Sequence, residues 1–478
     1  MSQGPNVAPD RSLPGIDRRI RELERRHDLL QYQAGGWCLW PVLRFPVQSA
    51  LRLGASGGLQ ARSRWDRVRP ALDDLPRLVR AGGARYLVKT YISGLLERSG
   101  DSYKDIWFDD LLGAVGGGFK IVGINSPGFM ARSRSSLVPP DMSSTAIELA
   151  VSALIRLPGP SQLLGPAENI AVALAGEFGQ ATFPLRWVIR RLRAFHWYAR
   201  LYGQLLERVI PDVVLVADPG EYGLVAAAKE RQIPVVELQH GMMDAHHSGY
   251  SWTDYASPFR ARMPIPDALF LYGEQACRAL EGNGFWGEAL RNVGSPRVDD
   301  YRERRRTAPS STEECVLVVT TQGTESGAII NLLSRFVKIA RGALRFRLLV
   351  KLHPIYDTGS LAAYRAAFTA QPEVEVLAGT AEVSTFALLA KASLHVSISS
   401  SCHYDALALG VPTAVLPFAT HEVVLPLVAA GHAHLAPDAE TLLELAQGWR
   451  ELRPSEAIGE YYFRRGALAN MRRELVRL

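Results

Sequence analysis

Short, almost wholly apolar runs alternate with amphipathic stretches along most of the chain. In the first half, the runs VVLVAD at 213–218 and VVELQ at 235–239 flank an amphipathic stretch at 222–232, and a longer one occupies 186–210. Strands that are apolar on both faces are typical of parallel sheets with helices on each side. Alternation of such strands with helices predicts the α/β class.

A second alternating series begins near residue 315. Its predicted strands lie at 315–323, 346–354, 374–379, 394–401 and 412–418. Residues 299–314 (DDYRERRRTAPSSTEE) separate the two series, and they predict an interdomain linker because they are polar, rich in turn formers and without an apolar period. A chain of 478 residues is also too long for one ordinary core. We therefore expect two Rossmann-like domains, at 85–298 and 315–455, followed by a helix at 456–478.

Residues 1–84 predict a basic, helical N-terminal extension. The stretch 11–30 is amphipathic, which favours a helix, whereas 54–69 is typical of a loop. The apolar face of this helix is formed by Ile20, Leu23, Leu29 and Leu30. Trp37, Trp40 and Arg44 follow it closely. Two interpretations stay open: this Trp/Arg cluster docks onto the first domain, which we favour, or it lies at a membrane interface.

Basic charge is concentrated in residues 1–90. They hold 16 of the 54 Lys and Arg residues but only 8 of the 48 Asp and Glu residues, so the rest of the chain is almost neutral. Such a segment attracts anionic partners, and an anionic membrane surface is the partner we expect. No nucleic-acid-binding motif accompanies the basic residues, so a nucleic acid is not expected.

The sequence favours a cytoplasmic protein. A peripheral position on the inner face of the plasma membrane is compatible with this location. No uninterrupted apolar run is long enough to span a bilayer, and the N-terminus lacks the basic start and apolar block of a secretory signal. The four cysteines have no short spacing, which suits a reducing compartment without a disulfide framework.

Polar residues gather where predicted strands of the second domain end, the edge at which open α/β sheets bind ligands. The turn Gln322, Gly323 and Thr324 leads into a helix, and its small residues allow backbone N–H groups to approach a phosphate. The next strand ends in Lys351, His353 and Pro354, where the imidazole can donate to a phosphate or a ribose. Each group also has a purely structural interpretation. The turn at 322–324 would be an ordinary connection from strand to helix, and His353 would be bonded to a loop carbonyl.

A third group follows the strand at 394–401. Ser399, Ser400 and Ser401 precede a helix, and Asp405 lies one turn inside it. These hydroxyls either cap the free N–H groups of the helix or, together with those N–H groups, hold a phosphate. Asp405 suits a ribose hydroxyl or the capping network.

The first domain offers a candidate general base. His240 follows a predicted strand directly, between Gln239 and Gly241, and a neutral imidazole there can accept a proton from an acceptor hydroxyl. Asp218 and Glu221, after the preceding strand, are further acceptor-side candidates. His246 and His247 lie close by, but no spaced carboxylate supports a metal site, so none is expected.

Several of these motifs occur in a known order. The stretch GSPRVDDY at 294–301 resembles the G-x-P-R-x-D element of a bacterial superfamily that contains capsule polysaccharide transferases and CDP-glycerol glycerophosphotransferases. The His-Gly, His-Pro, serine-pair and Gly-x-Pro elements of that superfamily resemble His240-Gly241, His353-Pro354, Ser400-Ser401 and Gly410-Val411-Pro412. The combination of His353-Pro354 with Ser400-Ser401 is also similar to that of GT-B transferases that use CMP-sialic acid or CMP-Kdo. The resemblance covers about residues 211–430.

The resemblance implies a GT-B glycosyltransferase that moves a sugar from a CMP-, CDP- or UDP-linked donor to a bacterial surface glycan such as capsule or lipopolysaccharide. The second domain would bind the nucleotide-sugar donor, the first a glycan or lipid-linked acceptor, and the last helix would cross back to the first domain. Neither a metal nor a cofactor is implied. Gln239 stands where the glycerophosphotransferases usually have Trp, which makes polyol-phosphate transfer a less favoured alternative.

Two further alternatives remain. A nucleotide-sugar 2-epimerase shares the fold but needs paired carboxylates in the cleft, for which Asp218 and Glu221 are the nearest candidates. A catalytically silent GT-B subunit that scaffolds a glycan-assembly complex is the other, although the retained histidines and serines argue against it.

Overall fold

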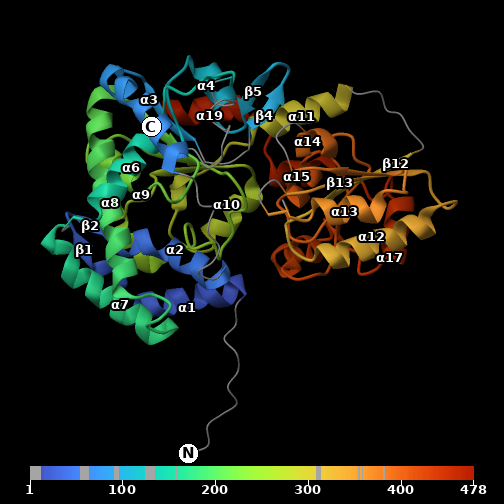
Figure 1. Ribbon diagram of the computed structural model, residues 1–478, viewed down its shortest axis with the longest axis horizontal. Helices are drawn as coiled ribbons and strands as arrows, with labels where there is room; N and C mark the ends of the chain where they lie inside the picture. The colour runs from blue at the N-terminus through green and yellow to red at the C-terminus, as the bar shows by residue number, and fades with distance from the viewer. Residues whose placement is uncertain are drawn as a thin grey trace, which may run out of the picture.

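Two lobes lie side by side, each built around a parallel sheet (Figure 1). The structure is a computed structural model that describes residues 12–53, 64–90, 96–123, 135–157, 159–307, 314–353, 356–357, 359–379 and 383–478. The predicted α/β class with two Rossmann-like domains is confirmed. Within the described residues, no helix is both long and apolar enough to cross a membrane.

The first lobe has a seven-stranded parallel sheet of order β11-β10-β9-β8-β3-β6-β7. Its strands are β3 (Tyr86–Thr90), β6 (Phe119–Val122), β7 (Met142–Ser143), β8 (Val213–Val216), β9 (Val235–Leu238), β10 (Ala268–Leu271) and β11 (Leu290–Asn292). Val214 and Val216 pack under α8 (Leu185–Val209), whereas Leu215 faces α4 (Asp109–Val115) on the other side. Further helices of this lobe are α6 (Thr145–Leu154), α7 (Leu164–Phe178), α9 (Tyr222–Lys229) and α10 (Glu274–Glu281).

The second lobe has a six-stranded parallel sheet of order β14-β13-β12-β15-β16-β17. Its strands are β12 (Cys315–Thr320), β13 (Phe346–Lys351), β14 (Val374–Leu377), β15 (Leu394–Ser397), β16 (Thr413–Val415) and β17 (His434–Leu435). Helices cover both faces, which explains the nearly continuous apolar strands. These helices are α12 (Ser326–Ala340), α13 (Leu361–Phe368), α14 (Thr385–Leu389), α15 (Cys402–Ala408), α16 (Leu425–Ala429) and α17 (Ala439–Gln447).

The N-terminal extension is part of the first lobe's core. Helices α1 (Leu13–Arg26) and α2 (Trp40–Leu53) pack beside α7 and α8. All four predicted apolar positions are fully buried, although α1 ends before Leu29 and Leu30, which lie in a short 3-10 turn. Trp40 is 0% exposed and Trp37 is 9% exposed. Their indole N–H groups donate to Glu24 (2.7 Å) and Glu230 (2.9 Å), respectively. The docking interpretation is therefore correct, and insertion of these two rings into a membrane is wrong.

Three segments differ from their predicted structure. Helix α3 (Arg64–Arg80) begins inside the predicted loop 54–69, whose residues 54–63 lie outside the described part of the chain. The first part of the predicted linker 299–314 belongs to helix α11 (Pro296–Thr307). Val298 and Tyr301 of this helix are buried against the second lobe, but two apolar residues form no period that would predict a helix. Residues 308–313 of that linker are also outside the described residues.

The third difference is at the C-terminus, where the predicted single helix is two helices. Gly466, at φ +75°, separates α18 (Glu456–Tyr462) from α19 (Ala467–Val476). Met471 and Leu475 of α19 belong to the buried cluster of the first lobe, beside α4. Figure 1 shows this last helix, in red, on the first lobe, so the chain returns to the lobe in which it began.

Candidate functional site

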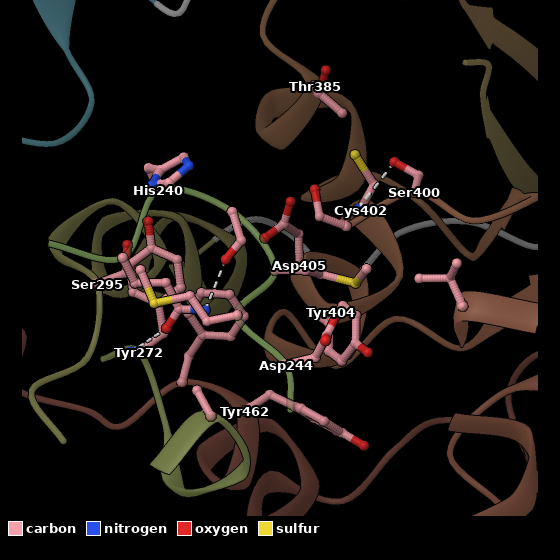
Figure 2. Close-up of a pocket in the computed structure, with 18 of the residues that line it drawn as sticks. His240, Asp244, Tyr272, Ser295, Thr385, Ser400, Cys402, Tyr404, Asp405 and Tyr462 are labelled. Atoms are coloured by element: carbon pink, nitrogen blue, oxygen red, sulfur yellow. Dashed lines mark hydrogen bonds between the residues drawn. The ribbon is translucent and has the colours of Figure 1, made fainter. Parts of the chain in front are cut away.

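A cleft of about 730 Å³ lies between the two lobes. Its first-lobe wall comes from the loop after β9 and from the hairpin of β4 (Leu96–Ser99) and β5 (Ser102–Asp105). Its second-lobe wall comes from the end of β13 and the starts of α14 and α15. Because parallel strands of both sheets end at this cleft, polar residues that are distant in the sequence meet here (Figure 2).

His353 lines the second-lobe wall, as does Lys351. The His353 ring stacks on Tyr356 with 4.5 Å between ring centroids, and its Nδ1 accepts from the Tyr356 N–H (3.2 Å). The His353 backbone N–H donates to Asp357 (3.1 Å). Burial lowers the pKa of His353 below its ordinary value and that of Lys351 to about 8. Thus the imidazole is held in one orientation and is neutral near pH 7. Pro354 lies outside the described residues.

Ser400 and Ser401 also line the cleft, at the start of α15. Ser400 Oγ accepts from the Cys402 N–H (3.2 Å), as the dashed line in Figure 2 shows. The Ser401 side chain makes no capping hydrogen bond. One hydroxyl is therefore used for the turn, and the other is open to a ligand.

Asp405 lies at the centre of the cleft. In Figure 2 its carboxylate points away from α15 toward the first lobe. Burial raises the pKa of Asp405 to about 7, although the nearby guanidinium of Arg297 acts in the opposite direction. This carboxyl group can therefore gain or lose a proton close to neutral pH.

Gln322, Gly323, Thr324 and Ser399 do not line the cleft. Gln322 Oε1 accepts from the N–H (2.9 Å) and the hydroxyl (3.1 Å) of Ser399, and the Gly323 N–H donates to Asp357 (2.9 Å). A Cβ on Gly323, at φ +78°, would lie 2.4 Å from Tyr356 Cβ. The structure thus uses this predicted phosphate loop to hold strand ends together.

His240 lines the first-lobe wall of the cleft, opposite the second-lobe motifs (Figure 2). Burial lowers its pKa to about 4, so the ring is neutral at pH 7. Gln239 shapes the turn beside it: its Nε2 donates to the Gly241 carbonyl (2.8 Å), and its Oε1 accepts from the Tyr272 N–H (2.8 Å). Gln239 and Gly241 also line the cleft.

The two histidines that follow are held by neighbouring side chains. His247 packs between Phe45 and Tyr250, with 4.8 Å between ring centroids on each side, and His246 Nδ1 lies 3.4 Å from Asp17. Among the residues that the structure describes, no group of three His, Cys, Asp or Glu side chains could hold a metal ion.

Asp218 and Glu221, predicted on the acceptor side, are not part of the cleft lining. Glu221 forms an ion pair with the buried Lys89 of β3, and Asp218 Oδ1 accepts from the Gly220 N–H (2.6 Å). Both carboxylates turn toward partners at the ends of β3 and β8. The pair therefore lies outside the cleft that His240 lines, and its acceptor-side role stays a prediction.

Arg297 is a cleft residue that sequence reasoning did not assign to the site. It pairs with Glu97 of β4, and its guanidinium lies 3.9 Å from the ring centre of Phe386. The Ser384 hydroxyl, at the start of α14, donates to the same carboxylate. The arginine of the G-x-P-R-x-D stretch was a usable signal for Arg297, whereas Glu97 is in a hairpin without any motif.

The fold is similar to that of solved nucleotide-sugar enzymes. A UDP-GlcNAc 2-epimerase from Neisseria meningitidis bound to UDP-GlcNAc has a TM-score of 0.51 and 15% identity, with 82% of this chain and 100% of that chain covered. A UDP-N-acetylglucosamine 2-epimerase has a TM-score of 0.50 and 16% identity, with 83% and 96% covered. MurG of Acinetobacter baumannii has a TM-score of 0.45 and 11% identity, with 82% and 100% covered.

No protein-family model matches the chain, and no curated protein matches its sequence. At 15–16% identity the structural likeness shows the fold and nothing finer. Two parallel sheets, a cleft between them and a final helix that returns to the first lobe agree with that likeness. The chain therefore has the GT-B fold.

Proposed function

We propose that this protein is a glycosyltransferase that moves a sugar from a nucleotide-activated donor to an acceptor hydroxyl. One observation carries the proposal: His240 from one lobe and His353, Ser401 and Asp405 from the other line a single cleft. A cleft of about 730 Å³ between two domains is the size and place expected for a ligand as large as a nucleotide sugar. The proposed acceptor is a growing bacterial surface glycan, free or lipid-linked.

In this proposal the second lobe holds the donor. His353 and the Ser401 hydroxyl donate to its phosphates, and Asp405 accepts from the ribose. His240 takes the proton of the acceptor hydroxyl as the oxygen of that hydroxyl bonds to the anomeric carbon. The bond from the anomeric carbon to the phosphate oxygen breaks, and the negative charge on the leaving phosphate is stabilised by Lys351 and Arg297, both of which line the cleft.

Nucleotide binding tests the proposal directly. Thermal unfolding would be followed with CMP, CDP, UDP, GDP and TDP in turn, because a ligand that binds only the folded state raises its stability by about 2.7 kcal/mol at one hundred times its Kd. We expect the nucleotides of one nucleobase to stabilise the protein, and that nucleobase identifies the donor class. Transfer is then measured with the matching nucleotide sugars. Absence of binding by all five nucleotides in calorimetry would overturn the proposal.

A 2-epimerase is the second candidate function. Although Asp218 and Glu221 lie elsewhere, four other carboxylates line the cleft, and such an enzyme needs carboxylates there: Glu97, Asp244, Asp405 and Glu422. Proton NMR of UDP-GlcNAc incubated with the protein in D₂O separates the two functions. Appearance of a C2 epimer, with deuterium at C2 and without any acceptor, would replace the transferase proposal. Sugar transfer only in the presence of an acceptor would exclude the epimerase.

A further inference from the structure

Helices α1 and α2 of the N-terminal extension lie against the loop that carries His240. This segment, residues 240–251, joins β9 to the rest of the first lobe and is neither strand nor helix. Backbone carbonyls in such a loop need hydrogen-bond donors, because buried polar groups are rarely left without partners. Side chains of the extension, about 200 positions away in the sequence, supply several of them.

Arg44 of α2 is fully buried and binds the far end of the loop. Its Nη1 donates to the Ser248 carbonyl (2.5 Å) and to the Ser251 hydroxyl (2.8 Å), and its Nη2 donates to the Ser251 carbonyl (3.2 Å). Its charge is balanced within the extension by Glu24, with which it forms an ion pair, and by Asp17 at 3.7 Å.

Gln48, one turn further along α2, binds the middle of the loop from two sides. Its Nε2 donates to the His246 carbonyl (2.6 Å), and its Oε1 accepts from the Ser248 N–H (2.9 Å). One amide group thus fixes two residues of the loop backbone relative to the helix. Phe45 adds its stack on His247 beside this pair.

Helix α1 binds the same segment through two further hydrogen bonds. Arg21 Nη2 donates to the Ala245 carbonyl (2.5 Å), and Asp17 accepts from the Ser251 hydroxyl (2.7 Å). Apolar packing alone would allow the loop to slide, whereas directional bonds to the carbonyls of residues 245, 246, 248 and 251 fix its register. The two helices therefore bind the loop backbone, and the first bonded residue, Ala245, lies five residues after His240.

The extension also reaches the cleft itself. Ser12, Leu13 and Pro14, at the start of α1, line it together with Met242 and Asp244 of the loop. Any acceptor that approaches His240 along this side passes the first turn of α1. Figure 1 shows that first turn, in blue, next to the second lobe.

We propose that α1 and α2 form a clamp that fixes loop 240–251 and sets the position of His240 in the cleft, with Arg21, Arg44 and Gln48 as positioning residues. The clamp itself is independent of the proposed function. Only the role of His240 as a general base rests on the proposed function. The clamp makes the extension an integral part of the acceptor side of the site, because it both orients the base and lines the route to it.

The test uses the full chain, two loop variants, one control variant and three measurements. Gln48→Leu keeps the size of the side chain but removes both loop hydrogen bonds, and Arg21→Ala removes the bond to Ala245. Arg19→Ala is the matched control, because Arg19 lies on the same helix but donates to Glu177 of α7 (3.0 Å). Amide hydrogen exchange of residues 240–251 is followed by mass spectrometry, and kcat is compared with nucleotide affinity.

We expect exchange of the loop amides to increase at least about tenfold in both loop variants and not in the control, because local opening follows the loss of backbone partners. We expect kcat to fall at least about tenfold while the nucleotide Kd stays within about twofold, because only the base is displaced. Unchanged exchange in the folded loop variants, or an equal increase in Arg19→Ala, overturns the clamp. Faster exchange with unchanged kcat overturns the positioning of His240.

If the parent protein binds no nucleotide, the proposed function fails while the exchange measurements still decide the clamp. If Gln48→Leu does not fold, Arg21→Ala decides, because the Arg21 side chain lies at the edge of the cluster with 22% of its surface exposed.

Discussion

His353 is the residue on which donor binding depends most in the proposed site. Its ring is fixed by Tyr356, whereas Asp357 accepts from its backbone N–H, so replacement by Ala removes the side-chain donor and keeps the backbone contact. Loss of a hydrogen bond to a charged phosphate costs about 1.5–3 kcal/mol, and we expect His353→Ala to weaken nucleotide binding roughly ten- to a hundredfold. Calorimetry measures the affinity, and an unchanged melting temperature is the control. Equal affinity in the variant would contradict this role.

His240 should affect turnover and not donor affinity. A general base contributes about a hundred- to ten-thousandfold in rate, so His240→Gln is expected to lower kcat in that range while the nucleotide Kd is retained. The acid limb of the pH profile identifies the base, since activity rises with pH as the base loses its proton. A limb near pH 4 belongs to His240, and one near pH 7 would identify Asp405 instead.

The burial of Glu237 predicts that the free energy of unfolding depends on pH. It is 1% exposed on β9, and burial raises its pKa to about 8, well above the unfolded value near 4.3. The stability contributed by the protonated group is complete below that unfolded pKa and is lost as the pH rises through 8. Glu237→Gln keeps an oxygen to accept from the Tyr250 hydroxyl but cannot ionise.

We therefore expect Glu237→Gln to be more stable than the parent at pH 8, by roughly 1–3 kcal/mol, and nearly equal to it at pH 4.5. Chemical denaturation at the two pH values measures this difference. A constant difference at both values would show that Glu237 does not change its protonation between the folded and unfolded states.

At the scale of elements, Gly294 decides how the C-terminal segment crosses the first lobe. Gly294 has φ +94°, and a Cβ at this position would lie 2.1 Å from the Arg464 carbonyl oxygen. This oxygen is a backbone atom of the segment between α18 and α19, so it cannot turn away as a side chain could. Gly294→Ala therefore combines a strained φ with a clash and is expected to cost about 2–4 kcal/mol of unfolding free energy.

Gly287→Ala is the matched control for that substitution. It has φ +50° but no heavy atom within 4 Å of the added Cβ, so it measures backbone strain alone, about 1 kcal/mol. Thermal unfolding of the two variants compares them. Equal destabilisation would show that the contact between Gly294 and the Arg464 carbonyl can relax.

At the scale of the whole molecule, the contact of Glu97 with Arg297 and Ser384 bridges the lobes. Glu97 comes from the first-lobe hairpin and Ser384 from the start of α14 in the second lobe. Glu97→Gln removes the charge that holds both donors, at a cost of about 1.5–3 kcal/mol to this contact between the lobes. We expect a larger radius of gyration in small-angle scattering. Arg98→Gln, next to it and exposed, should leave the radius unchanged, and an unchanged radius in Glu97→Gln would contradict the bridge.

The sequence by itself determined the features that depend on neighbouring residues. Alternation of apolar runs with amphipathic stretches was enough to predict two parallel sheets, because strand burial and helix faces follow from spacings of two to four residues. Polar motifs directly after strands, such as His240 and His353, were placed at the cleft for the same reason: the carboxyl ends of parallel strands meet at one edge of a sheet.

Only the tertiary structure decided which groups are already used by the protein. Gln322 is satisfied by Ser399, 77 positions away, and Glu221 pairs with Lys89, 132 positions away. Trp37 is buried against Glu230, 193 positions away. Arg297 and Glu97 enter the cleft from elements with no shared pattern. Composition and spacing describe a side chain's chemistry, but its availability depends on partners that folding brings together from distant parts of the chain.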